Sequence, residues 1–500
     1  MINKDNKILY SYRIVSQGMH IPRTSTINKR IWRHPILEFK RGKKIRFYFE
    51  GIEVEAYEGE SIAAALYAIG IDVFSWSSRL RRPRGTFCMI GKCSSCFMNV
   101  NGVPNVRTCI EPVREGIHVR RQIGLPEVPK TKFVGGISEE EVIETDVLVI
   151  GGGPAGLEAT LTAAEYGLNV TLVNEHFKLG GQLVKQTHKF FGSKDLFGGL
   201  RGFQIAESLS KKVLELTNVK VLTQTTAYGI FRDLWVGLAS RDKLYRVKAK
   251  AIIIATGAQE NYLVFPGNDL PGVMGAGGAQ TLMNEYGILP GEEILTVGSG
   301  NVGLIVSYQL LQADAKVKAV LEIAPSIGGW FVHAAKIRRY GVPILVQHTI
   351  KEAWGHERVE GATIVQVDEK FNPIPGTERE ITCDLILLAV GLTPDYTLLV
   401  QAGAKMAWIP ELGGLVALRT KYLETTIPGI FIAGDITGIE EATTAMIEGR
   451  IAGLSAVIKI LGPIEKAIEE REKLLKFLEE YRKSPVLSIT RVGMKKALIS

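Results

Sequence analysis

The chain has 500 residues, which is too long for a single hydrophobic core and fits about three domains. Hydrophobic residues make up 46% of it and charged residues 22%, the proportions of an ordinary globular protein. The longest apolar runs, such as Leu385 to Leu392, are shorter than the roughly 20 residues that span a bilayer. The N-terminus also lacks the pattern of a secretory signal, so we expect no transmembrane segment and a cytoplasmic location.

The net charge of +8 is concentrated near the N-terminus. Residues 1–50 carry twelve Lys and Arg against three acids, a local excess of +9. Two interpretations of residues 1–39 stay open: a solvated basic arm, or an arm that docks onto an acidic partner protein. No nucleic-acid-binding module accompanies the charge, so we do not expect nucleic acid as a partner.

Residues 40–122 read as a small β-grasp-like, ferredoxin-like module. Lys44–Glu50 and Ile52–Tyr57 form an expected hairpin, and a helix begins at Ser61 and ends at Gly70. A second strand pair is expected around Asn101-Gly102, a favoured tight-turn dipeptide. Residues 124–140, with prolines and a Gly-Gly pair, look like a linker.

Four of the five cysteines lie in this module, at Cys88-x4-Cys93-x2-Cys96-x12-Cys109. In a reducing compartment such a cluster indicates metal ligation and not disulfides. The first spacings are those of plant-type ferredoxins, which favours a [2Fe–2S] cluster, although four thiolates would also suit zinc. The flanking Arg79, Arg81, Arg82 and Arg84 would offset the cluster's negative charge, and we expect them to raise its reduction potential.

From Thr145 onward, strands alternate with helices, which predicts doubly wound α/β domains. The expected strands are 146–150, 169–174, 251–255, 293–297, 316–321, 385–390 and 430–433. The residues after Pro463 form an amphipathic helix that we expect to dock on the rest of the chain, within a tail of residues 463–500.

The strongest motif is the glycine turn Gly151-Gly-Gly153-Pro154-Ala155-Gly156, which has a strand before it and a helix after it. Gly151 permits the tight turn, Gly153 lets the backbone approach a pyrophosphate, and Gly156 lets the helix pack on the sheet. The helix N-terminus then offers free N–H groups to phosphates. Glu175 follows the next strand, where it can accept from a ribose hydroxyl.

A second turn, Gly298-Ser-Gly300-Asn-Val-Gly303, has the same context, and Glu322 ends its next strand. An acid at that position suits an unphosphorylated ribose, which favours NAD over NADP. The alternative is a relic turn that preserves the fold and binds no ligand.

With these turns the chain resembles the two-dinucleotide-binding-domain flavoproteins, the family of thioredoxin reductase. Further motifs carry the resemblance over residues 145–460: Gly180-Gly181-Gln182-Leu183, Ala255-Thr256-Gly257, Ala389-Val390-Gly391 and Gly434-Asp435. The resemblance implies two nested Rossmann-type domains, the first formed by 145–261 and 391–460 and the inserted one by 262–390. It also implies that Asp435 binds the ribityl chain of a flavin held at Gly151–Gly156.

One departure from that family concerns cysteine. Thioredoxin reductases carry a Cys-x-x-Cys pair in the inserted domain, and this sequence has only Cys383 there. We expect Cys383 to be a buried thiol in a strand over 381–387, and we expect no disulfide reduction.

The ferredoxin-like module followed by nested Rossmann domains resembles the α subunits of dye-linked L-proline dehydrogenase, opine oxidase, hydrogen cyanide synthase and heterotetrameric sarcosine oxidase. In that family a glycine-oxidase-like flavoprotein β subunit oxidises the amino acid. The α subunit binds FAD, ATP or NAD at the first Rossmann site, and an FMN can lie at the subunit interface. The sequence carries neither a folate-type C-terminal domain nor a C-terminal cysteine cluster, so we expect the L-proline dehydrogenase type.

Three functions follow as hypotheses. The chain is the electron-transfer α subunit of a hetero-oligomeric amino-acid dehydrogenase, with no acid–base catalytic residue of its own. Alternatively, it is a self-contained NADH:acceptor flavin oxidoreductase, or a scaffold that binds nucleotides as structural ligands. Two aromatic and histidine groups could line a flavin pocket but fit core packing better: His188, Phe190 and Phe191, and Trp330, Phe331 and His333. We expect the glycine-rich Gly272–Ala279 to be the crossover into the inserted domain.

Overall fold

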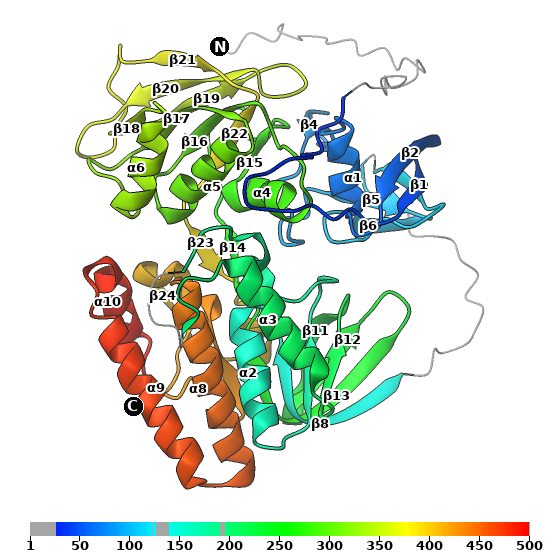
Figure 1. Cartoon of the computed structure of the whole chain (residues 1–500), viewed down its shortest axis with the longest axis vertical. Helices are drawn as coiled ribbons and strands as arrows, with labels where there is room; N and C mark the ends of the chain where they lie inside the picture. Colours follow the sequence, from blue (N-terminus) through cyan, green and yellow to red (C-terminus); the bar gives the residue numbers. More distant parts are fainter. Residues whose placement is uncertain (1–26, 123, 127–139, 191–195, 500) are drawn as a thin grey trace, which may run out of the picture.

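The computed structural model describes residues 27–122, 124–126, 140–190 and 196–499. The expected linker at 124–140 and the first part of the basic arm therefore lie almost entirely outside the described residues, as does Phe191. The described chain forms three lobes, each built on its own sheet (Figure 1). No helix in the described ranges combines the length and the hydropathy that crossing a membrane would require.

The first lobe has a five-stranded sheet in the order β2-β1-β7-β5-β6. Its strands are β1 (Lys44–Phe49), β2 (Ile52–Tyr57), β5 (Phe97–Val100), β6 (Val103–Arg107) and β7 (His118–Arg121), with the short pair β3 (Ser75–Trp76) and β4 (Pro83–Arg84) beside it. Helix α1 (Ile62–Ala68) is wholly buried, and the Ser61 hydroxyl caps it by accepting from Ala64 N. Both expected strand pairs are confirmed, because β1 pairs with β2 and β5 pairs with β6 in antiparallel register.

The second lobe is a seven-stranded sheet in the order β10-β9-β8-β13-β12-β11, and β26 pairs with the C-terminal end of β13, beyond the part that pairs with β12. Its strands are β8 (Glu141–Ile150), β9 (Val170–Val173), β10 (Val219–Leu222), β11 (Thr226–Ile230), β12 (Trp235–Ala239), β13 (Leu244–Ile254) and β26 (Ile430–Ile432). Helices α2 (Pro154–Glu165), α3 (Gly202–Glu215) and α8 (Ala442–Leu461) belong to this lobe. Ile254 pairs with Ile432, so the chain leaves this sheet and returns to it about 180 residues later.

The third lobe is the inserted domain, with a parallel sheet in the order β15-β22-β16-β17-β18. Its strands are β15 (Val273–Gly275), β16 (Glu293–Val297), β17 (Lys316–Glu322), β18 (Ile344–Val346) and β22 (Leu385–Leu388), and its helices are α4 (Ala276–Gln280), α5 (Asn301–Gln312) and α6 (Phe331–Arg339). A three-stranded antiparallel sheet adds β19 (His348–Trp354), β20 (Gly361–Gln366) and β21 (Arg379–Thr382). The nesting of one Rossmann-type domain in the other is thereby confirmed.

Two short antiparallel strands, β14 (Ala258–Glu260) and β23 (Leu392–Pro394), connect the nested domains in both directions. After β23 the chain adds α7 (Thr397–Ala402), β24 (Met406–Ile409) and β25 (Gly414–Ala417) before it returns to the sheet of the first Rossmann domain. The tail forms α9 (Glu465–Tyr481) and α10 (Ser488–Lys496). Ala467 and Leu478 of α9 are buried, so the expected docking helix is present.

Two local predictions are wrong. Gly272–Ala279 is not a crossover but the edge strand β15 and the start of α4, with Val273 paired to Ile386. The strand expected over 381–387 is broken at Cys383, and β21 and β22 on either side belong to different sheets. The cause is Asp384, whose carboxylate accepts from the backbone N–H groups of Glu292 and Glu293 and turns the chain. Cys383 itself is buried, as expected.

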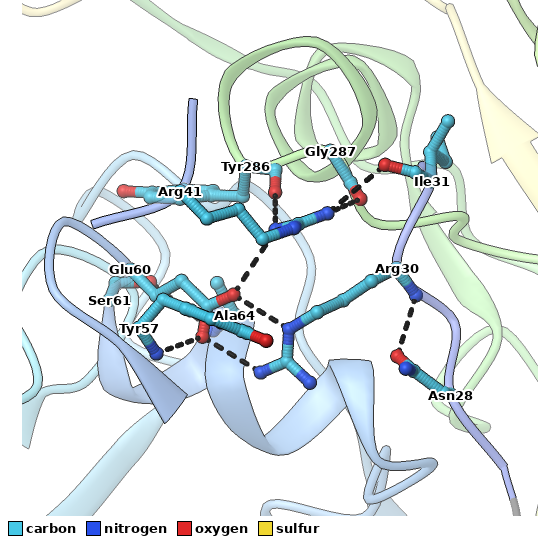
Figure 2. A network of polar contacts seen from close by, with 10 residues as sticks. All are labelled: Asn28, Arg30, Ile31, Arg41, Tyr57, Glu60, Ser61, Ala64, Tyr286 and Gly287. Atoms are coloured by element: carbon cyan, nitrogen blue, oxygen red, sulfur yellow. Dashed lines mark hydrogen bonds and ion pairs between the residues drawn. The ribbon is translucent and has the colours of Figure 1, made fainter. Parts of the chain in front are cut away.

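The described part of the basic arm is not a solvated tail. Residues 27–41 run as a strap between the cysteine module and the inserted domain, as Figure 2 shows. Arg30 donates twice to the Glu60 carboxylate at 2.8 Å, and Arg41 donates to the carbonyl oxygens of Tyr286 and Gly287. The Arg30 and Glu60 side chains are only 6% and 5% exposed. These charges therefore hold two lobes together inside the chain.

Candidate functional site

The first glycine turn connects β8 to α2 and has no room for side chains at two of its positions. Gly151 has φ +114°, and a Cβ there would lie 2.2 Å from the Ala255 carbonyl oxygen. A Cβ on Gly156 would lie 1.8 Å from the Gly151 carbonyl oxygen. The nearest atom to a Cβ on Gly153 is 3.8 Å away. No side chain caps α2, so its first N–H groups are available to a phosphate group.

The second turn, between β16 and α5, repeats this geometry. Gly298 has φ +104°, and a Cβ there would lie 2.3 Å from the Ala389 carbonyl oxygen. A Cβ on Gly303 would lie 2.1 Å from the Gly298 carbonyl oxygen, while Gly300 faces open space. No side chain caps α5 either. Both turns thus have the shape of a pyrophosphate cradle.

A Gly-Gly pair closes each turn on its outer side. Gly180 N donates to Gly152 O at the first turn, and Gly329 N donates to Ser299 O at the second. A Cβ on Gly181 would lie 2.7 Å from the Gly153 Cα. Gln182 follows in the short helix η1 (Gly181–Lys185) and is exposed.

The residue at the end of the strand that follows each glycine turn differs between the two domains. Ile150 pairs with Val173 and Val297 pairs with Leu321, so Asn174 and Glu322 are the structurally equivalent residues. Asn174 Oδ1 accepts from Gly152 N at 3.1 Å, and Glu322 Oε2 accepts from Ser299 N at 3.0 Å. Sequence reasoning misses Asn174 because Glu175, one residue later, satisfies the same pattern.

Glu175 instead faces the cysteine loop. Its carboxylate contacts Lys92 Nζ at 3.0 Å and Arg107 Nη1 at 3.0 Å, and Lys92 also reaches Asp395 at 2.7 Å. Burial alone would lower the pKa of Lys92, but Glu175 and Asp395 outweigh it and raise the pKa, so Lys92 is a cation. No sequence pattern indicates these contacts, because they depend on how two lobes dock.

The Ala-Thr-Gly motif lies at the crossover from β13 to β14. Thr256 Oγ1 donates to Asp395 O at 3.2 Å, and Gly257 O accepts from Asp395 N at 2.9 Å. Gly257 has φ +73° and faces open space. The motif therefore holds Asp395 in place beside the first glycine turn. Asp395 in turn pairs with the Lys92 ammonium.

Asp435 begins the short helix η6 (Asp435–Thr437) directly after β26. Gly434 packs against Ala155 of α2, where a Cβ would lie 3.0 Å from the Ala155 Cβ. Burial, with the nearby Glu448 and Glu440 carboxylates, raises the pKa of Asp435 to about 7. Glu448 in turn accepts from Gly434 N and from the Thr437 hydroxyl, and it is paired with Arg482 at the end of α9. The tail thus holds the loop that presents Asp435.

The four cysteines of the module lie close together. Cys88, Cys93 and Cys96 are on the loop before β5, and Cys109, after β6, meets them there. Cys88, Cys96 and Cys109 are at most 2% exposed, and Cys93 is partly exposed. The thiols of Cys109 and Cys93 both hydrogen-bond Cys88 and hold its pKa well below the usual value, and Cys109 also meets Cys96. Gly91 N donates to Cys109 Sγ at 3.2 Å.

This donor set fits a two-iron cluster. The hydrogen-bonded thiols run from Cys93 through Cys88 and Cys109 to Cys96. Four thiolates divided between two irons are the ligands of a [2Fe–2S] cluster.

The arginines before the cysteines are partly neutralised. Arg82 and Arg84 both approach the Asp269 carboxylate, at 3.5 and 3.4 Å. Their expected effect on the reduction potential of the cluster stays a prediction. Lys92 is closer in sequence to a cysteine ligand, because it directly precedes Cys93.

The two weaker aromatic and histidine groups meet between the nested domains. His188 stacks on Phe190, and its ring lies edge-on to His333 with centroids 6.2 Å apart. Burial lowers the pKa of His188 to about 4, so the ring is neutral at pH 7. Trp330 and Phe331 are 41% and 72% exposed and do not join this contact.

A buried polar seam beside these histidines joins the same two domains. Lys185 donates to Gly277 O and to the Thr281 hydroxyl, and Gln309 donates to the Thr187 hydroxyl at 2.7 Å. Nothing in the sequence marks these residues, because each is an ordinary polar side chain on a predicted helix or loop. The seam, with the strap at 27–41, fixes the relative orientation of the lobes.

The comparisons with known proteins agree with this geometry. Residues 145–449 match the pyridine nucleotide-disulphide oxidoreductase family, and residues 42–124 match a 2Fe-2S iron-sulfur cluster binding domain. Relatives include the alpha chain of sarcosine oxidase from Rhizobium meliloti (25% identical over 84% of this chain and 46% of that protein) and an opine oxidase chain from Agrobacterium tumefaciens (28% identical over 62% and 65%). The chain thus spans between about half and two thirds of these relatives.

A solved structure of L-proline dehydrogenase from P. horikoshii is similar over more of the chain. It is 28% identical, with a TM-score of 0.65, and the match covers 89% of this chain and 79% of that one.

Proposed function

Because the chain belongs to the pyridine nucleotide-disulphide oxidoreductase family and carries an N-terminal 2Fe-2S domain, we propose that it is the α subunit of a multi-subunit amino-acid dehydrogenase. Its role there is electron transfer and nucleotide binding, and the substrate of the complex is L-proline. The observation that carries the proposal is the contact between the cysteine loop and the first nucleotide site, through Lys92 and Glu175. The similarity to L-proline dehydrogenase supports the substrate.

The residues proposed to hold the cofactors follow from the geometry. Cys88, Cys93, Cys96 and Cys109 ligate the [2Fe–2S] cluster, which when bound supplies a one-electron carrier. The first turn takes FAD or another adenine nucleotide, ATP or NAD, and the second turn takes NAD. An FMN at the interface with the partner protein completes the set. The residues proposed to bind the nucleotides are Gly151, Gly153, Pro154, Ala155, Gly156, Asn174, Glu175, Gly181, Gln182, Thr256, Gly257, Gly298, Gly300, Gly303, Glu322, Gly434 and Asp435.

Disulfide reduction, the activity in the family's name, does not fit this chain. Cys383 is the only cysteine of the inserted domain, and it is buried. Burial, with the neighbouring Asp384 carboxylate, also raises the pKa of its thiol to about 12, so it is not a nucleophile at neutral pH. Oxidation of the C–N bond is therefore assigned to a glycine-oxidase-like flavoprotein, the partner β subunit.

Activity measurements test this assignment. The purified full chain should reduce no dye with L-proline, and activity should appear when the partner protein is added. Dye reduction by the chain alone would contradict the proposal, because it would place amine oxidation in this chain.

A second candidate function rests on the intact second turn and Glu322. In it, the chain is a self-contained NADH:acceptor oxidoreductase that passes hydride from the second site to a flavin at the first. Anaerobic addition of NADH should then bleach the flavin absorbance. Absence of bleaching would reject this second function.

A further inference from the structure

Four side chains join the cysteine loop to the first nucleotide site. Lys92 lies on the cysteine loop, Arg107 ends β6, Glu175 follows β9, and Asp395 follows β23. We call these four residues the bridging ion pairs. Their side chains are between 20% and 30% exposed, so water screens them less than it screens pairs on the open surface.

Backbone contacts fix both ends of the bridging ion pairs. Arg107 also donates to Gly91 O inside the cysteine loop and to the Thr226 hydroxyl of β11. On the nucleotide side, Asp395 is held by Thr256 and Gly257 of the crossover. Asp395 therefore keeps its position when the Lys92 ammonium shifts, and a shift away from Glu175 Oε1 breaks that ion pair.

The second nucleotide site has no such bridge among the described residues. The Glu322 carboxylate accepts from Ser299 N, from the Ser299 hydroxyl and from Ala324 N, all within its own domain. The link to the cysteine loop is thus a property of the first site alone.

We infer that Lys92 is a positioning residue that couples the redox state of the cluster to nucleotide binding at the first site. The inference rests on the cluster and the adenine nucleotide of the proposed function. One electron added to the cluster puts one more negative charge beside Cys93, the chain neighbour of Lys92. The Lys92 ammonium is then drawn toward the cysteines, and Oε1 of Glu175 becomes free to accept from a ribose hydroxyl while Oε2 stays paired with Arg107.

Linkage makes this coupling reciprocal. If reduction frees Glu175 for the ribose, the nucleotide binds the reduced protein more tightly and raises the cluster's midpoint potential by the same free energy. Simple repulsion between a diphosphate and a more negative cluster predicts the opposite sign. The sign of the change in nucleotide affinity therefore distinguishes coupling through the Lys92–Glu175 ion pair from direct repulsion between the diphosphate and the cluster.

The test is a titration of the full iron-loaded chain, freed of bound nucleotide, with ADP as the probe. We expect ADP to bind the dithionite-reduced protein about tenfold more tightly than the oxidised protein, within the usual range of coupling between sites. For a one-electron couple this equals a rise of about 59 mV in the midpoint followed by EPR. Lys92→Gln and Glu175→Gln should each bring the ratio close to one, and Lys92→Arg should retain most of it.

Lys44→Gln is the matched control. Lys44 is a cation of the same module that pairs with Glu55 on the exposed hairpin, so its removal should leave the ratio unchanged. A wild-type ratio of one, or weaker binding to the reduced protein, overturns the inference while the proposed cofactors stand. A chain that holds no iron or binds no ADP overturns the inference and the proposed function together.

Discussion

The two glycine turns of this chain have nearly the same backbone and different surroundings. In both, a positive-φ glycine packs on a carbonyl oxygen and a second glycine lets the helix approach the first. The residues at the end of the strand that follows each turn differ, however. Next to the first turn are Asn174 and the Glu175 carboxylate, which pairs with Lys92 and Arg107 of the cysteine module. Next to the second turn is Glu322, whose hydrogen bonds stay within its own domain. The turn identifies a nucleotide site, and the residues that surround its ribose end determine what that site is connected to.

This difference connects the first site to the cysteine loop through ion pairs, which the second site lacks among the described residues. The cysteine loop contacts Glu175 next to the first turn, and Gly434, the residue before Asp435, packs against Ala155 of α2. The cysteine module contacts the inserted domain through Arg41 of the strap, through Arg82 and Arg84, and through the buried Phe87 and Cys88. None of these contacts involves Glu322.

The largest effect should come from removing a cluster ligand. Cys96→Ser should lose the iron, because Cys96 is buried against Cys109 with no other ligand to replace it. Cys383→Ser is the matched control, since it is equally buried but lies in the inserted domain, and it should keep full iron. Iron content and visible absorbance measure both, and iron retained in Cys96→Ser would contradict the ligand assignment.

A methyl group in the first turn should have the next largest effect. Gly156→Ala places a Cβ 1.8 Å from Gly151 O, so the turn must open, at a cost of about 3 kcal/mol or more. We expect a lower midpoint of thermal unfolding and no nucleotide at the first site. Gly153→Ala, whose Cβ would meet nothing closer than 3.8 Å, should change the unfolding midpoint much less. Equal destabilisation by the two would show that the close approach at Gly156 does not govern the turn.

Asp435 should make stability depend on pH. Its folded pKa of about 7 lies above the ordinary value of 3.8, so the folded state binds more protons than the unfolded state between these values. Stability should therefore fall as pH rises from about 4 to about 7, by on the order of a few kcal/mol in total. Asp435→Asn should remove this part of the slope, as followed by chemical denaturation. An unchanged slope would show that the carboxyl is not desolvated.

The smallest effect should be on the potential of the cluster. Replacing Arg82 and Arg84 by Gln should lower the midpoint only slightly, because both guanidinium groups approach Asp269. Lys92→Gln should lower it more, since Lys92 precedes Cys93 directly. Redox titration followed by EPR compares the two, and a larger shift for the arginine pair would reverse the ranking.

The features that the sequence predicts well are local. Gly151 and Gly298 are fixed by backbone geometry within a few residues, and the Asn101-Gly102 turn by its own dipeptide, so a pattern suffices. The nesting also follows from the order of short motifs. The role of Lys92 is not predictable in this way, because its partners lie 83 and 303 residues away and meet it only when the lobes dock.

Two further failures have the same physical cause. The sequence shows Arg30 only as part of a charged arm, and the fold alone shows that Glu60 pairs with it in a buried position. The distance along the sequence from the glycine turn cannot distinguish Glu175 from its neighbour Asn174. The hydrogen bond from Gly152 N to Asn174 does distinguish them. Long-range pairing, not local propensity, decides which polar residue serves the site.

The central claim is that this chain is an electron-transfer subunit with a cluster beside an adenine-nucleotide site. Its most direct test is to purify the native complex, measure its iron and zinc, and identify its bound nucleotides and protein components by mass spectrometry. We predict about two irons per chain, an adenine nucleotide and a flavoprotein partner. Zinc in place of iron, or a chain isolated without nucleotide and without a partner, would contradict the claim.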